Sequence, residues 1–131
     1  MNYHYDNQHY NPPAPVLPIT VRAPGNSMKH ITTDALVDTG ADMTCLPRAL
    51  INALGAERAS TYNVVGINGV LIGPADSYFL EFEIAATKTT KKLVEVIAVA
   101  DELILGRNLI NEFKLRLNGP TLELSIILGT E

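Results

Sequence analysis

The chain has 131 residues, of which 47% are hydrophobic and 18% are charged, and its formal net charge is −4. This length and composition predict one domain with a packed core and exclude an intrinsically disordered chain. The negative charge argues against nucleic acid as a partner, and the lack of an apolar stretch of transmembrane length argues against a membrane.

Cys45 is the single cysteine, so the chain forms no intrachain disulfide. It alternates with apolar neighbours, and we expect a small buried side chain rather than a nucleophile. The sequence also lacks an apolar N-terminal run. Both features favour a reducing compartment, and we expect a cytoplasmic protein.

Residues 1–15 are rich in Tyr, Asn, His and Pro. His4 and His9 have no neighbouring cysteine or acid at a spacing typical of metal ligands, so we expect no metal here. The prolines at the end of this segment would interrupt a strand ladder. We therefore predict a flexible leader over residues 1–15 and a single folded domain over residues 16–131. The alternatives are a segment that docks or one that is removed during maturation.

The remainder of the chain alternates between short apolar runs and turns. Strands are predicted over residues 16–23, 28–37, 43–46, 59–65, 70–72, 78–84, 92–100, 103–105, 114–117 and 121–128. Short helices are predicted over residues 49–54, ended by Gly55, and over residues 107–113. The cluster of Lys88, Lys91 and Lys92 is predicted to be a solvated hairpin loop. This pattern indicates an all-β barrel or sandwich-like domain.

The most informative stretch is Asp38-Thr39-Gly40, which follows the apolar run Ala35-Leu36-Val37 directly. A carboxylate beside a buried strand needs hydrogen-bond donors around it, because its desolvation without partners is costly. Thr39 supplies a hydroxyl group, and Gly40 permits the close approach of another backbone. One interpretation is an Asx-type turn in which Asp38 bonds its own backbone and Gly40 has positive φ. A functional carboxylate explains the dry flanks and the second acid, Asp42, better.

A hairpin tip is predicted at Gly66-Ile67-Asn68-Gly69, between two strand-like runs. Taken locally, this sequence is also that of an ordinary surface turn. Ile67 is apolar at a position where a polar residue is normally expected. Such a residue suits a tip that closes over a ligand or contacts a partner.

Three segments together resemble a known family. Val37-Asp38-Thr39-Gly40-Ala41-Asp42 resembles the active-site signature of the retroviral-type aspartic proteases, the retropepsins. Val64-Val65-Gly66-Ile67-Asn68-Gly69-Val70 resembles their glycine-tipped flap, and Ile104-Leu105-Gly106-Arg107-Asn108-Leu109-Ile110 resembles their strand-to-helix motif. The resemblance implies an all-β, single-domain closed barrel with one or two short helices. It also implies an aspartic endopeptidase without a cofactor, acting on polypeptides as a two-fold homodimer.

The chemistry of this family requires two carboxylates that share one proton, because their like charges prevent both from ionising easily. The sequence contains one Asp-Thr-Gly motif. Asp42 lies only four residues after Asp38 and is too close in the chain to take the second position. A second Asp38 must therefore come from a second copy of the chain related by a two-fold axis.

The resemblance also implies roles for individual residues. The catalytic group is Asp38, Thr39 and Gly40, with Thr39 bonding across the dimer axis. Substrate would contact the signature and the flap tip, at the residues Ala41, Asp42, Gly66, Ile67, Asn68 and Gly69. Leu36, Val65, Ile67 and Val70 are candidates for subsite walls, although each also suits a core position.

Two residues of the C-terminal motif are implied as structural support. Arg107 would anchor Asp42 as a charge-assisted ion pair, the alternative being a lone surface cation. Asn108 would cap or brace the start of the following helix. Residues 121–128 are a candidate for an intersubunit sheet, whereas residues 1–15 are not, because of their prolines.

Two other functional interpretations remain open. The first is a retropepsin-like module for dimerisation or peptide binding with little turnover. The second is a β-barrel in which Asp-Thr-Gly occurs by coincidence. The intact motif favours the enzyme, since a pure binding module has no need of an acid at Asp38.

Overall fold

The computed structural model describes residues 2–26, 28–66, 68–84, 91–99 and 101–127. Its strands are β1 (Asn2–His4), β2 (Val16–Arg22), β3 (His30–Val37), β4 (Thr44–Cys45), β5 (Arg58–Val65), β6 (Leu71–Ile84), β7 (Lys91–Ile97), β8 (Ile104–Leu105), β9 (Lys114–Asn118) and β10 (Glu123–Ile127). The two helices of this part of the chain are α1 (Arg48–Leu54) and α2 (Arg107–Ile110).

Six strands close into a barrel, as the resemblance to the retropepsins implied. They follow the order β2-β3-β8-β4-β7-β6, and an additional pairing of β2 with β6 closes the ring. Apolar residues at every second position face the interior: Ile19 and Val21 on β2 are each 1% exposed, and Leu80 on β6 is fully buried. This alternation is what a strand with one buried face requires, so the hydrophobic pattern determines which face points inward.

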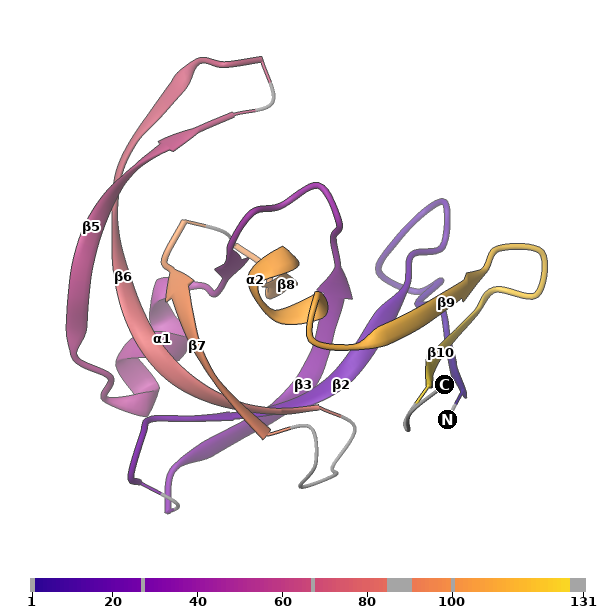
Figure 1. The fold of residues 1–131 in the computed structure, drawn as a ribbon, viewed down its shortest axis with the longest axis horizontal. Helices are drawn as coiled ribbons and strands as arrows, with labels where there is room; N and C mark the ends of the chain where they lie inside the picture. Colours follow the sequence, from indigo (N-terminus) through magenta and orange to yellow (C-terminus); the bar gives the residue numbers. More distant parts are fainter. Residues whose placement is uncertain (1, 27, 67, 85–90, 100, 128–131) are drawn as a thin grey trace.

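The β5–β6 hairpin extends beyond the barrel and curves over one end of it (Figure 1). The sequence predicted two strands over residues 70–84, and this was wrong, because β6 runs without a break from Leu71 to Ile84. Gly73 and Pro74 lie in the part of β6 that pairs with β5 alone. Proline is tolerated there, since its missing N–H group would face no second strand. We call residues 58–76 the flap hairpin.

A second, three-stranded sheet has the order β1-β10-β9. The prediction that residues 1–15 form no strand was wrong, because Tyr3 on β1 pairs with Leu124 on β10 and packs against the core. A further bridge joins Asp6 to Ala14. The prolines did not prevent this strand, since they follow it in the connection to β2. In Figure 1 this sheet lies on the opposite side of the barrel from the flap hairpin.

The helices are short and agree in position with the sequence pattern. Gly55 ends α1 in the left-handed conformation with φ of 70°, as predicted, whereas α2 ends at Ile110 rather than at residue 113. Lys88, from the lysine cluster predicted to be a loop, lies outside the described residues. Lys91 and Lys92 of that cluster belong to β7, so the loop prediction was wrong for these two residues. Among the described residues, no helix is long and apolar enough to cross a membrane.

Candidate active site

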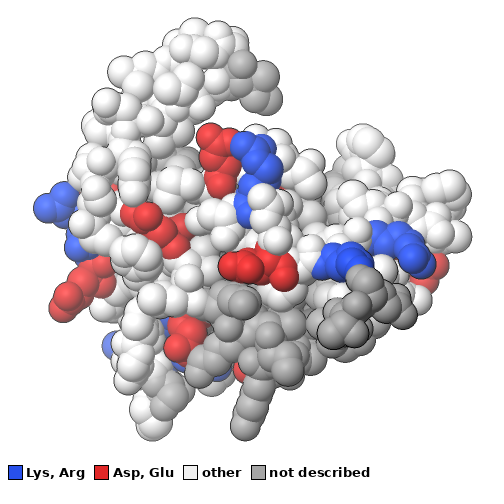
Figure 2. All heavy atoms as spheres, in the orientation of Figure 1, with Lys and Arg blue, Asp and Glu red and all other residues white. Residues whose placement is uncertain are grey.

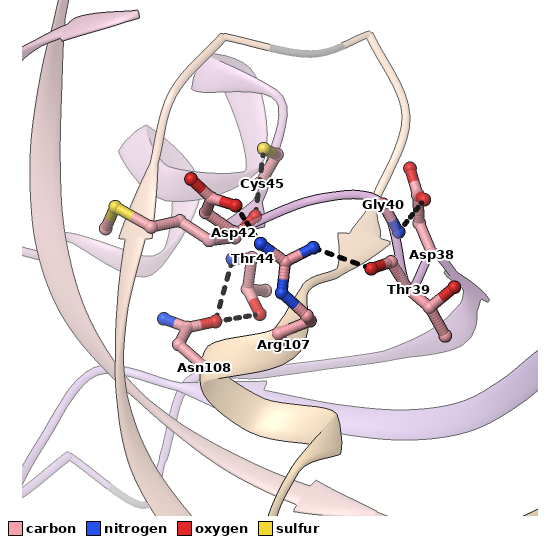
Figure 3. A network of polar contacts seen from close by, with 9 residues as sticks. Asp38, Thr39, Gly40, Asp42, Thr44, Cys45, Arg107 and Asn108 are labelled. Carbon is pink, nitrogen blue, oxygen red and sulfur yellow. Dashed lines mark hydrogen bonds and ion pairs between the residues drawn. The ribbon is translucent and has the colours of Figure 1, made fainter. Parts of the chain in front are cut away.

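Asp38 begins the loop that joins β3 to β4 (Figure 3). Its backbone N–H donates to the carbonyl of Leu105 on β8 at 3.1 Å, which continues the ladder one residue beyond β3. Its carboxylate accepts a hydrogen bond from the N–H of Gly40 at 2.9 Å. The local turn suggested by the Asx interpretation is therefore present, and it orients the carboxylate.

Gly40 does not have the positive φ that the turn interpretation required. A side chain at this position would instead place its Cβ 3.2 Å from the Asp38 carboxylate oxygen. The glycine thus allows the backbone to approach the carboxylate closely enough to donate to it. Glycine is needed here so that the Gly40 N–H can reach the Asp38 carboxylate, and not because the backbone adopts a positive φ.

Helix α2 supports the loop from the barrel side. The N–H groups of Arg107 and Asn108 donate to the carbonyls of Ala41 and Asp42, at 2.9 Å and 3.2 Å respectively. The preceding Gly106 packs so closely that an added Cβ would lie 2.5 Å from the Met43 carbonyl oxygen. The Asp-Thr-Gly loop and the Gly-Arg-Asn motif, far apart in the sequence, therefore form one unit.

Arg107 and Asp42 form the ion pair expected from the sequence, and Arg107 also donates to the carbonyl of Thr39 at 2.7 Å (Figure 3). The alternative of a lone surface cation is wrong. The Asp42 side chain remains 85% exposed. One guanidinium group therefore links two residues of the loop while the Asp42 carboxylate stays accessible.

Asn108 does not cap α2, because the N-cap residue is Gly106 and no side chain caps the helix. Its side chain instead braces the barrel. The amide oxygen accepts from both the N–H and the hydroxyl of Thr44, each at 2.9 Å, and the amide nitrogen donates to the carbonyl of Glu95 at 2.7 Å. Asn108 thus ties α2 to β4 and β7.

Thr44 is a supporting residue that the sequence interpretation missed. It is fully buried, and its hydroxyl oxygen also accepts from the N–H of Gly106 at 3.0 Å. The available signal was a polar residue inside the apolar run from Met43 to Leu46. A buried hydroxyl group needs partners, which here come from a segment more than sixty residues later.

A groove of about 610 Å³ lies between the loop and the flap hairpin. Its walls come from the loop, from β5 and from the end of β7: Gly40, Ala41, Asp42, Met43, Cys45, Tyr62, Asn63, Val64, Val65, Gly66, Ile97 and Val99. Of the predicted subsite residues, Val65 lies in this wall, whereas Leu36 is half-buried in the barrel. The groove is mixed in character, because polar residues such as Asp42 and Asn63 line it together with apolar residues such as Met43 and Val64.

The tip of the flap hairpin is closed by short-range hydrogen bonds. The N–H of Gly66 donates to the Val70 carbonyl at 2.9 Å, and the N–H of Val70 donates to the Asn68 side chain at 3.1 Å. Gly69 has φ of 78°, a conformation that favours glycine. Ile67 lies outside the described residues. Gly66 is the predicted tip residue that also lines the groove.

Cys45 lies under the loop and is 8% exposed, as expected for a small buried side chain. Burial raises the pKa of its thiol, and the nearby charge of Asp38 raises this pKa further. The thiol therefore stays protonated at neutral pH and is a poor nucleophile. Among the described residues, no group of three histidine, cysteine or acidic side chains is placed to hold a metal ion.

Known proteins resemble this chain in sequence and in fold. The family model described as "Retroviral aspartyl protease" matches residues 12–118. The structure of a retropepsin-like aspartic protease from Rickettsia conorii is 19% identical, covers 95% of this chain and 88% of its own, and has a TM-score of 0.59. EIAV protease complexed with the inhibitor HBY-793 is 24% identical, covers 82% of this chain and 91% of its own, and has a TM-score of 0.49.

No curated protein sequence matches this chain significantly. The family match covers most of the chain, and the barrel with its signature loop, flap hairpin and Gly-Arg-Asn helix is the retropepsin-like fold. The chain therefore belongs to the retroviral aspartyl protease family.

Proposed function

We propose that this chain is the subunit of a homodimeric aspartic endopeptidase that hydrolyses peptide bonds in extended polypeptides. The observation that carries the proposal is the position of Asp38, at the start of a loop whose next residues line the groove beneath the flap hairpin. The Asp38 carboxylate is half-buried and is oriented by the Gly40 N–H. A carboxylate held in this way is suited to acid–base chemistry on a bound peptide.

Two Asp38 carboxylates, one from each subunit, would share a single proton across the two-fold axis. The ionised member removes a proton from water, which attacks the scissile carbonyl carbon. The protonated member polarises the carbonyl oxygen, and a proton is then delivered to the leaving nitrogen. Since the pair works with one proton, we expect activity at acidic rather than alkaline pH.

The exposed Thr39 would bond to the partner loop and hold the two carboxylates in register. The terminal sheet offers further surface for the dimer. β10 is already paired on both sides by β1 and β9, so a partner would contact the outer edge or a face of the sheet rather than replace a strand. This arrangement supports a dimer in which each subunit keeps its own terminal strands.

Substrate would lie extended in the groove and bond to the backbone of the loop and flap, as a strand added to a sheet. Asp42 is anchored by Arg107 and exposed, so its carboxylate can accept a substrate N–H. Gly40, Ala41, Gly66, Asn68 and Gly69 would contribute backbone groups and flexibility. Cys45, Val64, Ile97 and Val99 line the groove and favour an apolar substrate side chain.

We also propose the cytoplasm as the location of the protein. The support is Cys45, a free and buried thiol, which is compatible with a reducing environment. Immunodetection of the protein in separated cell fractions tests this location, and recovery from the culture medium alone would contradict it.

The test is cleavage of a mixed peptide library from acidic to neutral pH, with wild type and Asp38→Asn compared at several protein concentrations. We expect cleavage by wild type, a loss of at least about a thousandfold in Asp38→Asn, and specific activity that rises with concentration. Asn has nearly the shape of Asp, so circular dichroism should show an unchanged fold. Thr61→Val, altered on the flap away from the loop, serves as the active control.

Two results would contradict the enzyme. Cleavage retained in Asp38→Asn would show that another group or a contaminant is responsible. A folded, dimeric wild type that binds extended peptides and cleaves none would favour the alternative of a peptide-binding module.

A further inference from the structure

We propose that Tyr62 is a positioning residue of this site, since its hydroxyl fastens the outer strand of the flap hairpin to the barrel and thereby sets the position of the flap over the groove. The expected effect on KM rests on the proposed function. The expected effect on the exchange of the β5 amides can be tested without substrate.

Strand β5 is held by its ladder with β6 and has little other packing to fix its position. It is the last strand of the seven-stranded sheet and pairs with β6 alone. Seven of its eight residues are exposed, so apolar packing stabilises it little. An edge strand of this kind needs another attachment if the hairpin is to keep one position.

The Tyr62 side chain supplies that attachment. Tyr62 lies opposite Ala75 on β6, and its hydroxyl reaches past β6 to donate to the Glu95 carboxylate on β7 at 2.8 Å. The fully buried Ser77 on β6 donates to the same carboxylate oxygen at 2.7 Å. One oxygen of Glu95 therefore joins three neighbouring strands, and the strand that carries it belongs to the closed barrel.

Glu95 also connects the flap hairpin to the active-site loop. The backbone carbonyl of Glu95 accepts from the Asn108 side chain at 2.7 Å, and Asn108 holds Thr44 at the end of the loop. Tyr62 also forms part of the groove wall. The two sides of the groove are thus both fixed to Glu95, one through its side chain and the other through its backbone.

The electrostatics support a persistent hydrogen bond. The bond to Glu95 raises the pKa of the Tyr62 hydroxyl, so this group remains a donor across the working pH range. A hydrogen bond to a charged acceptor is stronger than one between neutral groups. Phenylalanine at this position would keep the aromatic ring in the groove wall and remove only the attachment.

The decisive variant is Tyr62→Phe. We expect KM for a peptide substrate to rise about tenfold with kcat little changed, the size expected for one hydrogen bond to a charged group. In hydrogen–deuterium exchange of the free protein, we expect the β5 amides to exchange about tenfold faster while those of β7 and β8 are unchanged.

Three further variants separate this attachment from a general effect on the flap. Thr61→Val removes the neighbouring hydroxyl, which bonds only within the flap hairpin, to Asp76 and Arg58, and should match wild type. Glu95→Gln keeps an acceptor oxygen but removes its charge, so its β5 exchange should lie between those of wild type and Tyr62→Phe. Glu95→Ala should raise β5 exchange at least as much as Tyr62→Phe, because it also removes the acceptor of the buried Ser77 hydroxyl. The double variant Tyr62→Phe/Glu95→Ala should show no more β5 exchange than Glu95→Ala alone.

Unchanged β5 exchange in Tyr62→Phe would overturn the proposal, and so would additive effects in the double variant. If wild type cleaves no peptide, the proposed function fails, but the exchange experiment still decides the role of Tyr62. If exchange increases while KM stays the same, Tyr62 holds the flap without positioning it for substrate, and the proposal is again wrong.

Discussion

The surroundings of Cys45 raise the pKa of its thiol. It is buried, its sulfur donates weakly to the Met43 carbonyl at 3.5 Å, and the nearby Asp38 charge disfavours the thiolate. The folded pKa of the thiol is therefore higher than the unfolded one. The folded state keeps the proton at a pH where the unfolded chain begins to lose it.

This shift predicts a pH dependence of stability. The contribution of Cys45 is complete below its unfolded pKa of about 8.5 and is lost as the pH rises through the folded value. Urea unfolding of wild type should therefore show stability falling above about pH 8.5 more steeply than in Cys45→Ala. Equal slopes in the two proteins would contradict a raised pKa at this position.

The polar network around Asp38 shows which residues a sequence can identify. Asp38 is a carboxylate directly after an apolar strand, and it drew attention for that reason. The pairing of Asp42 with Arg107 was implied by the resemblance to the retropepsins. Tyr62 and Glu95 occur in ordinary strand patterns, and only their hydrogen-bond partners distinguish them. Their partners lie on other strands, so no local pattern could reveal them.

At the scale of elements, the junction of β8 and α2 packs directly against the active-site loop. An added Cβ at Gly106 would lie 2.5 Å from the Met43 carbonyl oxygen and 2.8 Å from the Thr44 backbone nitrogen. Both neighbours are backbone atoms, which cannot move aside as a flexible side chain can. The glycine is therefore required by close approach and not by its own φ of −91°.

Replacement of Gly106 by alanine should accordingly destabilise the protein by about 2–3 kcal/mol, through overpacking. The displaced loop should also lower peptide cleavage. Urea unfolding measures the first effect, and a matched change at Gly119 is the control, because a Cβ there meets nothing within 4 Å. Gly119→Ala should change stability by less than about 0.5 kcal/mol. Similar urea midpoints for Gly106→Ala and Gly119→Ala would contradict this prediction, because they would show that the loop moves away from the added Cβ at little cost.

At the scale of the whole molecule, the barrel lies between two extensions, the flap hairpin on one side and the terminal sheet on the other (Figure 1). Acidic and basic side chains are scattered over the face shown in Figure 2 and form no broad basic patch there. The terminal sheet packs its inner face on the core through Leu124 and Ile126, which are 0% and 1% exposed. The first strand of the chain is therefore part of the folded unit.

Deletion of residues 1–4 tests the importance of this strand for the proposed dimer. It removes the Tyr3 side chain from the core and leaves one edge of β10 unpaired. We expect a less stable subunit, and a dimer that needs several-fold higher protein concentration for half of its maximal specific activity. Sedimentation velocity and a dilution series of cleavage measure this, with His4→Ala as a control because that side chain is exposed. An unchanged dissociation constant would place the dimer contacts elsewhere.

The sequence by itself determined the class of fold, the family and the residues of the signature loop. Alternating apolar positions specify strands and their buried faces, and a carboxylate in dry surroundings is conspicuous wherever it occurs. The end of α1 followed from Gly55 because a left-handed C-cap is a local requirement. These features depend on neighbours in the chain, so a single sequence contains them.

Only the tertiary structure decided how distant segments meet. It showed that residues 2–4 pair with β10, that Gly73 and Pro74 continue a strand, and that Asn108 braces Thr44 instead of capping a helix. Each of these results depends on which backbone groups are already paired by another strand. Hydrogen-bond satisfaction is a property of the assembled barrel, and for that reason it could not be predicted from local sequence.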